Sequence, residues 1–241
     1  MWDNPQALRQ LANTLLGISV LLLLFGTVHY TIHMQEFSLN VVQLTSAPHR
    51  VDTAEIEDVV SNELRGNFFT VDIENLRKSF EKLPWVRKAS VRRHFPWTLE
   101  VQLEEHVAIA QWNSDELVNT LGEVFEAETD QVLPKFVGQP DTSAEIAQMY
   151  KVFSGQLAPL KQEVVQISLS PRRAWQLHLN NGMVLELGRE QAQDRLARFV
   201  AVYPYSLAAL PHTANYVDLR YRNGFAAYLP GGAPSGQASQ G

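Results

Sequence analysis

An uncharged, strongly apolar run near the N-terminus constrains this chain more than any other feature of its sequence. Residues 11–28 contain no Asp, Glu, Lys or Arg. As an α-helix at about 1.5 Å per residue, the run spans roughly 27 Å, close to the hydrocarbon thickness of a bilayer. We therefore expect a transmembrane helix over residues 11–30, whose apolar side chains include Leu15, Leu16, Ile18, Val20, Leu21, Leu22, Leu23, Leu24 and Phe25.

Two other structures compete with a retained membrane anchor for this run. A buried core helix fits poorly, because the run is apolar on all sides and precedes every domain. A cleaved signal peptide needs a small-x-small cleavage site, for which Gly26-Thr27-Val28 is a poor candidate. The flanking charges, Arg9 and the terminal amine against Asp3, give a weak positive-inside signal. This signal favours a cytoplasmic segment over residues 1–10.

The composition excludes several classes of function. The formal net charge of -6 argues against nucleic acid as the main partner. The chain has no cysteine, so it forms no disulfide, thiolate metal site or cysteine nucleophile. Phosphate-loop, zinc-protease and nucleophile-elbow motifs are absent, and His29 and His33 are better explained as interfacial residues than as metal ligands. We expect no catalytic residue, no metal, no cofactor and no small-molecule substrate.

The segment after the anchor follows the order strand, helix, helix, strand, strand. Residues 37–44 alternate as a strand. Asp52 and Asp72 are predicted N-caps of two helices with apolar stripes, the second ended by Pro84. Residues 86–93 and 98–104 then alternate as two strands. In the second of these, Glu104 and its neighbour Glu105 must face opposite ways, so they form no carboxylate pair.

The remaining chain predicts a β-rich domain with two helices over residues 107–229. The clearest signal is the hairpin around Asn181-Gly182, flanked by alternating leucines. We expect further strands at 108–112, 117–120, 124–125, 216–221 and 225–229, helices over 146–157 and 196–203, and a loop at 134–140. Residues 230–241 are rich in Gly, Ser, Pro and Ala and predict a disordered tail. The fold class is α+β: one transmembrane helix, a β-α-α-β-β domain and a β-rich domain.

Several motifs in this order resemble the FtsQ/DivIB family of bacterial cell-division proteins, in its proteobacterial form, and the first unit, residues 37–106, resembles a POTRA domain. The residues that carry the resemblance are Gly66–Asp72, Leu83–Arg93, Phe95-Pro96-x-Thr98-Leu99-x-Val101, Leu187-Gly188-Arg189, Arg195-Leu196-x-Arg198-Phe199 and Val217-Asp218-Leu219-Arg220-Tyr221-x-Asn223-Gly224. One departure is His106-Val107-Ala108, where the family usually has a proline.

The resemblance implies a single-pass type II protein of the cell inner membrane, with a cytoplasmic N-terminus and periplasmic domains at the division septum. It implies an essential, non-enzymatic scaffold that binds the FtsB–FtsL complex and links early and late division proteins to control septal wall synthesis. FtsK, FtsW and FtsI are further partners that the resemblance suggests. Two alternatives remain: a POTRA component of another envelope assembly or secretion pathway, and a periplasmic wall enzyme.

The final predicted strand is a candidate binding edge. No later strand follows Phe225–Leu229, so its outer N–H and C=O groups can pair with an incoming peptide. We place Arg172, Arg173 and Arg220 near it as carboxylate-binding side chains. By resemblance, Arg172 and Arg220 meet acidic groups of FtsB, and the binding surface includes Tyr221, Asn223, Gly224, Phe225, Ala226 and Tyr228. The alternative is an edge covered by its neighbours and a set of solvated charges.

A second basic cluster lies on the first unit. It consists of Arg87, Lys88, Arg92 and Arg93, beside Trp85 and Trp97. A solvated strand face is the favoured interpretation, and contact with lipid headgroups or a partner helix is the alternative.

Overall fold

The computed structural model describes residues 5–32, 41–209, 214–222 and 224–229. Two compact units divide the chain, Met1–Glu105 and His106–Gly241. The expectations for residues 37–40, Asn223 and the tail fall outside the described residues.

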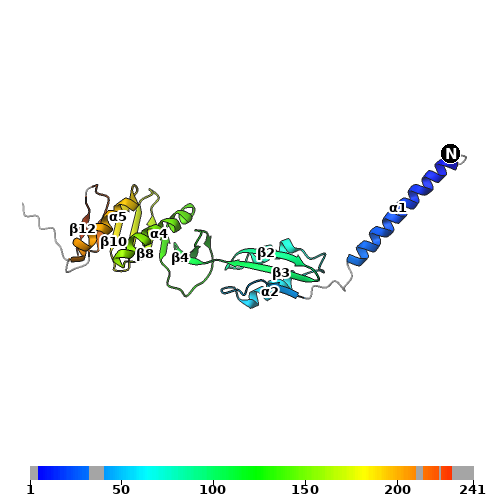
Figure 1. Ribbon diagram of the computed structural model, residues 1–241, viewed down its shortest axis with the longest axis horizontal. Helices are drawn as coiled ribbons and strands as arrows, with labels where there is room; N and C mark the ends of the chain where they lie inside the picture. Colours follow the sequence, from blue (N-terminus) through cyan, green and yellow to red (C-terminus); the bar gives the residue numbers. More distant parts are fainter. Residues whose placement is uncertain (1–4, 33–40, 210–213, 223, 230–241) are drawn as a thin grey trace, which may run out of the picture. The chain divides into compact units, whose positions relative to one another are not determined.

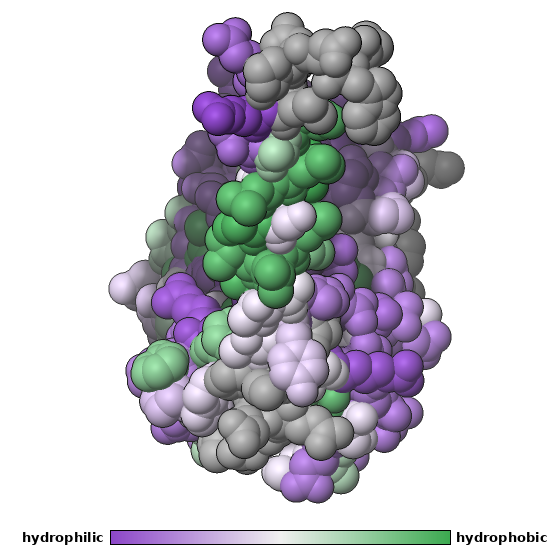
Figure 2. All heavy atoms as spheres, turned by 90° about the vertical axis from the view of Figure 1, so that its right-hand side faces the viewer, coloured by the Kyte–Doolittle hydropathy of each residue, from purple (hydrophilic) through white to green (hydrophobic). Residues whose placement is uncertain are grey.

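The N-terminal helix α1 (Pro5–Ile32) is longer than the predicted segment. Its apolar span, Arg9–Thr31, has a mean hydropathy of 2.1 and is not buried, so by length and composition it could cross a membrane. Figure 2 shows its hydrophobic side chains as a green band on the face turned to the viewer. The hydroxyls of Ser19 and Thr27 donate to backbone carbonyls four residues earlier, at 2.9 and 2.8 Å. These groups are thereby satisfied without water, as a bilayer requires.

The rest of the first unit has the predicted β-α-α-β-β order (Figure 1). Its elements are β1 (Val41–Leu44), α2 (Thr53–Glu63), α3 (Ile73–Phe80), β2 (Val86–His94) and β3 (Thr98–Glu105). The sheet order is β1-β3-β2, with β1 parallel and β2 antiparallel to β3. The helices and the sheet enclose a core that includes Ile56, Leu76, Phe80, Leu99 and Val101.

Both predicted N-caps are confirmed. The carboxylate of Asp52 accepts the N–H of Ala54 at 3.0 Å, and that of Asp72 accepts two N–H groups of the first turn of α3. The second helix ends at Phe80, earlier than the sequence pattern indicated. Leu83 still packs against the core from the following turn, which explains why it continued the apolar stripe.

The second unit is built on a nine-stranded sheet with the order β12-β11-β10-β9-β8-β7-β4-β5-β6. The strands are β4 (Ala108–Trp112), β5 (Glu116–Asn119), β6 (Val124–Phe125), β7 (Lys135–Val137), β8 (Val164–Leu169), β9 (Trp175–Leu179), β10 (Val184–Gly188), β11 (Tyr216–Asp218) and β12 (Ala226–Tyr228). The helices are α4 (Ser143–Leu157) and α5 (Ala192–Val202), with short 3-10 turns at Pro140–Thr142, Ala158–Leu160, Tyr203–Tyr205 and Leu207–Ala209.

Two of these strands correct the sequence analysis. The predicted loop at 134–140 contains β7, which pairs in parallel with both β4 and β8. Phe136 of β7 is fully buried between exposed neighbours, the alternation of a strand, but Pro134 and Pro140 gave the segment the composition of a loop. Strand β8 was not predicted at all. The last hairpin is present, but its strands are shorter than expected.

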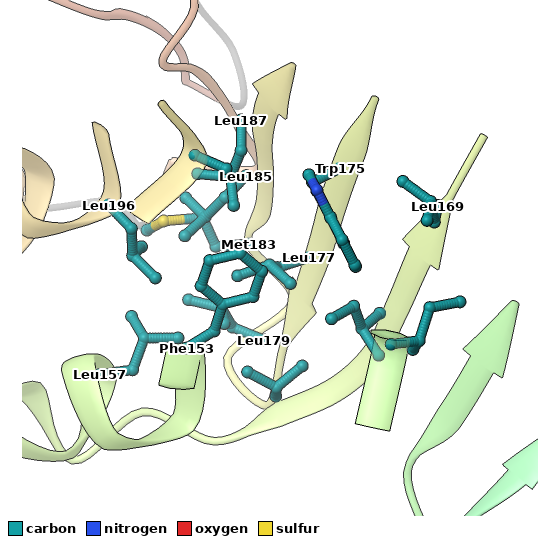
Figure 3. Close-up of a cluster of buried hydrophobic side chains, with 14 of the residues drawn as sticks. Phe153, Leu157, Leu169, Trp175, Leu177, Leu179, Met183, Leu185, Leu187 and Leu196 are labelled. Carbon is teal, nitrogen blue, oxygen red and sulfur yellow. The ribbon is translucent and has the colours of Figure 1, made fainter. Parts of the chain in front are cut away.

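Both helices of the second unit cover one face of the sheet, α4 over β7 and β8 and α5 over β10 (Figure 1). Phe153 of α4 and Leu196 of α5 point toward the sheet in Figure 3. They pack with buried strand residues that include Trp175, Leu177, Met183, Leu185 and Leu187. Residues of β10 and β11 belong to this core, and β11 in turn pairs with the final strand.

Candidate partner-binding edge

Strand β12 is the terminal strand of the nine-stranded sheet. It pairs antiparallel with β11, placing Ala226 opposite Asp218 and Tyr228 opposite Tyr216. On its other side, the described part of the chain supplies no strand. The Phe225 ring packs edge-on against Phe199 of α5, with ring centroids 6.0 Å apart. The strand is therefore packed against α5 at its start, and no strand of the described residues pairs with its outer side.

The backbone of Ala227 points to the open edge. On its other side, β11 is bonded to β10. The N–H of Leu219 donates to the carbonyl of Glu186, and the N–H of Val184 donates to the carbonyl of Asn215. Because hydrogen-bonding direction alternates along a strand, Asp218 of β11 is directed toward β12 and meets Ala226 there. Ala227, one residue on, then presents its N–H and C=O outward. These two groups are the natural start of a ladder with an incoming strand.

An ion pair sits beside this edge, at the end of β11. The carboxylate of Asp218 accepts from Nε of Arg220 at 2.9 Å, from Nη2 at 2.7 Å and from its backbone N–H at 3.0 Å. Hydrogen bonding from the Arg220 side chain, opposed by burial, lowers the pKa of Asp218. The Arg220 side chain remains 57% exposed. The pair therefore leaves part of the guanidinium exposed, in a geometry that can bind a carboxylate.

Gly188, at the end of β10, leaves space for the side chain of Arg220. Its φ is +72°, in the left-handed region that favours glycine. A Cβ atom at Gly188 would lie 3.0 Å from Cγ of Arg220 and 2.9 Å from Nη1 of Arg195. Arg195 in turn donates to the carbonyl of Leu187 at 2.6 Å. The glycine at the end of β10 thus makes room for two arginine side chains.

A groove of about 590 Å³ lies between α5 and the connection to β12. It has a basic rim and an aromatic floor, and its lining includes Arg195, Arg198, Phe199, Arg222 and Phe225. The sequence analysis did not assign a role to these arginines. The signal available was the spacing of Arg195 and Arg198 on one helical face, next to the Asp218–Arg220 motif.

Arg172 and Arg173 lie farther along the sheet from β12 than Arg220 does. Both lie in the turn between β8 and β9, and β9 is three strand spacings from β12, about 14 Å at about 4.8 Å per spacing. Arg173 pairs with Glu145 of α4 at 2.6 Å. Arg172 is exposed and lies at the same end of the sheet as Arg220, because β9 begins where β10 and β11 end. Only a partner that crosses the sheet end can touch both.

The other predicted contact residues lie around the turn into β12. Tyr221, Gly224 and Tyr228 are exposed, and Ala226 is half-buried. The Tyr228 ring meets Tyr216 edge-on at 6.4 Å. Among the described residues, no group of three or more His, Asp or Glu side chains is arranged to hold a metal ion.

The second basic cluster is partly engaged within its own unit. Arg87 pairs with Glu104 at 2.7 Å, and Arg93 donates to the carbonyls of Phe68 and Val71, both at 2.8 Å. Lys88 and Arg92 are exposed. The favoured interpretation, a solvated strand face, therefore describes only part of this cluster.

Comparison with known proteins assigns both units. Residues 37–106 match the family model described as "POTRA domain, FtsQ-type", and residues 110–220 match "Cell division protein FtsQ/DivIB, C-terminal". The cell division protein FtsQ of Nitrosospira multiformis is 45% identical, with 94% of this chain and 98% of the relative covered. Those of Bordetella pertussis and Burkholderia pseudomallei are 36% and 37% identical, with at least 93% of each chain covered. The chain belongs to the FtsQ/DivIB family of cell division proteins.

Proposed function

We propose that this chain is a non-enzymatic scaffold of the division complex, and that its β12 edge receives a strand from the FtsB–FtsL complex. The observation that carries the proposal is a short terminal strand whose outer backbone groups are open, next to an exposed arginine and a basic groove. The chain stands in the inner membrane as a type II protein at the septum, with both units in the periplasm. FtsK, FtsW and FtsI are further candidate partners.

Charge and shape support a particular class of ligand. Recognition by strand addition takes an extended peptide, and Arg198, Arg220 and Arg222 favour acidic side chains on it. The aromatic floor of the groove, Phe199 and Phe225, suits an apolar anchor next to the acidic residues. The ligand is therefore a segment with an extended stretch flanked by carboxylates and at least one large apolar residue.

The test is Ala227→Pro, with Ala227→Val as the matched control. Proline removes the outward N–H, while the inward hydrogen bonds of Ala226 and Tyr228 to β11 remain. Binding of a periplasmic FtsB peptide to the detergent-solubilised chain is measured by fluorescence anisotropy. We expect the proline variant to lose about tenfold or more in affinity, the equivalent of about one ladder hydrogen bond plus steric misfit, and the valine variant to bind normally. Equal affinity of the two variants would move the binding site away from β12.

A cellular experiment tests the pathway separately from the edge. A fluorescent fusion of the chain is expected at mid-cell in dividing cells, and depletion of the protein is expected to produce filaments. Uniform envelope fluorescence together with normal division on depletion would contradict the division role, and would favour another POTRA-dependent pathway.

A further inference from the structure

One end of the POTRA domain carries an aromatic cluster that the β12 edge does not use. Trp97 lies in the β2–β3 connection, with its ring 5.8 Å from Phe95, 5.7 Å from Phe68 and 6.3 Å from Phe69. Phe95 is 73% exposed and Phe69 is 47% exposed. We refer to Phe69, Phe95 and Trp97 as the aromatic tip. Large aromatic side chains held at a surface in this way mark an interaction site.

The aromatic tip is held in place by polar contacts. Arg93 ties the hairpin to the neighbouring loop through its hydrogen bonds to the carbonyls of Phe68 and Val71. Within that loop, Asn67 is buried, and its side-chain oxygen accepts the N–H groups of Phe69 and Thr70 at 3.0 and 3.1 Å. The cluster is therefore arranged before any ligand arrives, so little ordering is needed on binding.

The chain path keeps the aromatic tip within reach of the membrane. Val41, the first residue of β1, pairs with Thr98, the residue after Trp97. Eight residues, 33–40, connect Val41 to the end of α1 at Ile32. Even a fully extended connection of this length spans at most about 30 Å. The tip is thus at the end of the POTRA sheet where the chain arrives from the membrane helix.

The charge around the aromatic tip suits an anionic surface. The two segments that form it, residues 64–71 and 91–99, contain Arg65, Arg92 and Arg93 and no Asp or Glu, while Glu63, Asp72 and Glu100 adjoin them and Glu100 is the register partner of Arg92 across β2 and β3. Arg65 and Arg92 are exposed. Aromatic rings prefer the headgroup level of a bilayer, and basic residues near its surface are attracted to anionic lipid. The aromatic tip is exposed, is flanked by arginines and lies on a sheet joined to α1 by only eight residues. These properties favour a lipid surface over a peptide as its ligand.

We propose that the aromatic tip rests in the interfacial layer of the membrane that α1 crosses, with Arg65 and Arg92 facing anionic headgroups. The contact gives the POTRA domain a second attachment to the bilayer. It depends on α1 spanning the membrane and is independent of any partner at β12.

The test uses the full chain in lipid nanodiscs, with no other protein present. Because the chain has no cysteine, His94→Cys places a single fluorescent label beside the aromatic tip without removing its rings. Lys82→Cys, on the exposed turn before β2, is the matched control at the other end of that strand. Nitroxide lipids labelled near the headgroup quench a label that lies at the membrane surface.

In nanodiscs containing phosphatidylglycerol, we expect quenching at position 94 to exceed that at position 82 several-fold. Adding Phe95→Ser or Arg92→Glu to the His94→Cys chain is expected to reduce quenching at least twofold, while near-ultraviolet circular dichroism verifies the fold. Equal, weak quenching at the two positions would overturn the proposal and assign the tip to a protein partner. Quenching that neither substitution reduces would also overturn it, because the tip would then not carry the contact.

Discussion

The carboxylate of Asp218 accepts hydrogen bonds from both the guanidinium and the backbone N–H of Arg220. The shortest guanidinium bond is 2.7 Å, and the backbone bond is 3.0 Å. Hydrogen bonding by the Arg220 side chain is the largest cause of the lowered pKa of Asp218. A carboxyl whose pKa is lower in the folded state stabilises the fold above its unfolded pKa, about 3.9. That contribution is lost as the pH falls through the folded-state pKa.

Replacing Arg220 by alanine is expected to raise the pKa of Asp218 and to flatten the acid side of the stability profile. The loss at about pH 7 should stay below about 1 kcal/mol, because the side chain is exposed and solvent screens the pair. Thermal unfolding of the detergent-solubilised chain between about pH 3 and about pH 7 measures both effects. Arg222→Ala, an exposed arginine of the same turn, is the control and should preserve the wild-type profile. If the stability profiles of Arg220→Ala and Arg222→Ala coincided, Arg220 would not be the cause of the lowered pKa of Asp218.

Gly188→Ala is expected to destabilise the second unit by about 1 to 3 kcal/mol. The substitution forces a Cβ onto a left-handed residue and against the Arg195 and Arg220 side chains. Gly155 in α4 is the matched control, since a Cβ there meets no atom within 4 Å. Gly155→Ala should be neutral or stabilise by up to about 1 kcal/mol. Denaturant unfolding of the two variants gives the comparison, and a neutral Gly188→Ala would show that the arginines move aside.

Glu105→Gln is expected to loosen the segment before α2. The Glu105 carboxylate accepts the N–H groups of His49, Arg50 and Val51 at 2.9 to 3.0 Å. Burial favours a raised pKa, but these three hydrogen bonds outweigh it and lower the pKa of Glu105. The Glu105 carboxylate therefore stabilises the fold at neutral pH, and this stabilisation is lost as the pH falls through its folded-state pKa.

Amide hydrogen exchange at residues 49–51 measures this loosening directly. We expect exchange to accelerate about tenfold to a hundredfold in Glu105→Gln, corresponding to about 1 to 3 kcal/mol. Glu104→Gln is the control, because Glu104 pairs with Arg87 on the other face of the strand. Acceleration of the same size in both variants would show that strand β3, and not the carboxylate, controls the segment.

The orientation of the chain is testable with single cysteines. Gln6→Cys and Gln131→Cys lie on opposite sides of the apolar span Arg9–Thr31 in the sequence. If the N-terminus is cytoplasmic, a membrane-impermeant thiol reagent should label position 131 in spheroplasts and position 6 only after lysis. The reverse pattern would contradict the type II orientation, and labelling of both before lysis would contradict a membrane-spanning helix.

Local signals predicted much of the fold. Asp52 and Asp72 cap helices through bonds to residues two or three positions away, and the Asn181-Gly182 turn joins neighbouring strands, so short sequence windows contain the whole interaction. Strand β7 differs, since its three residues are strand only because β4 and β8 flank them. No short window contains those partners, and composition then favoured a loop.

In the candidate site, too, local features were predictable from the sequence and features that depend on distant partners were not. The terminal position of β12 was predictable because no strand pattern follows it in the sequence. The relation of Arg220 to Gly188 and Arg195 was not, because the parallel pairing of β10 with β11 brings together segments separated by helix α5. The distance of Arg172 and Arg173 from the edge likewise depends on two intervening strands that a linear pattern does not order.

The outward backbone of Ala227 has a consequence for how this surface changes over evolutionary time. A ladder formed by main-chain atoms places few demands on the side chains that project from it. If β12 receives a partner strand as proposed, Ala226 and Ala227 can therefore change between species while the same docking geometry persists. Divergent relatives should then exchange partners more readily than the identity of their terminal strands would suggest.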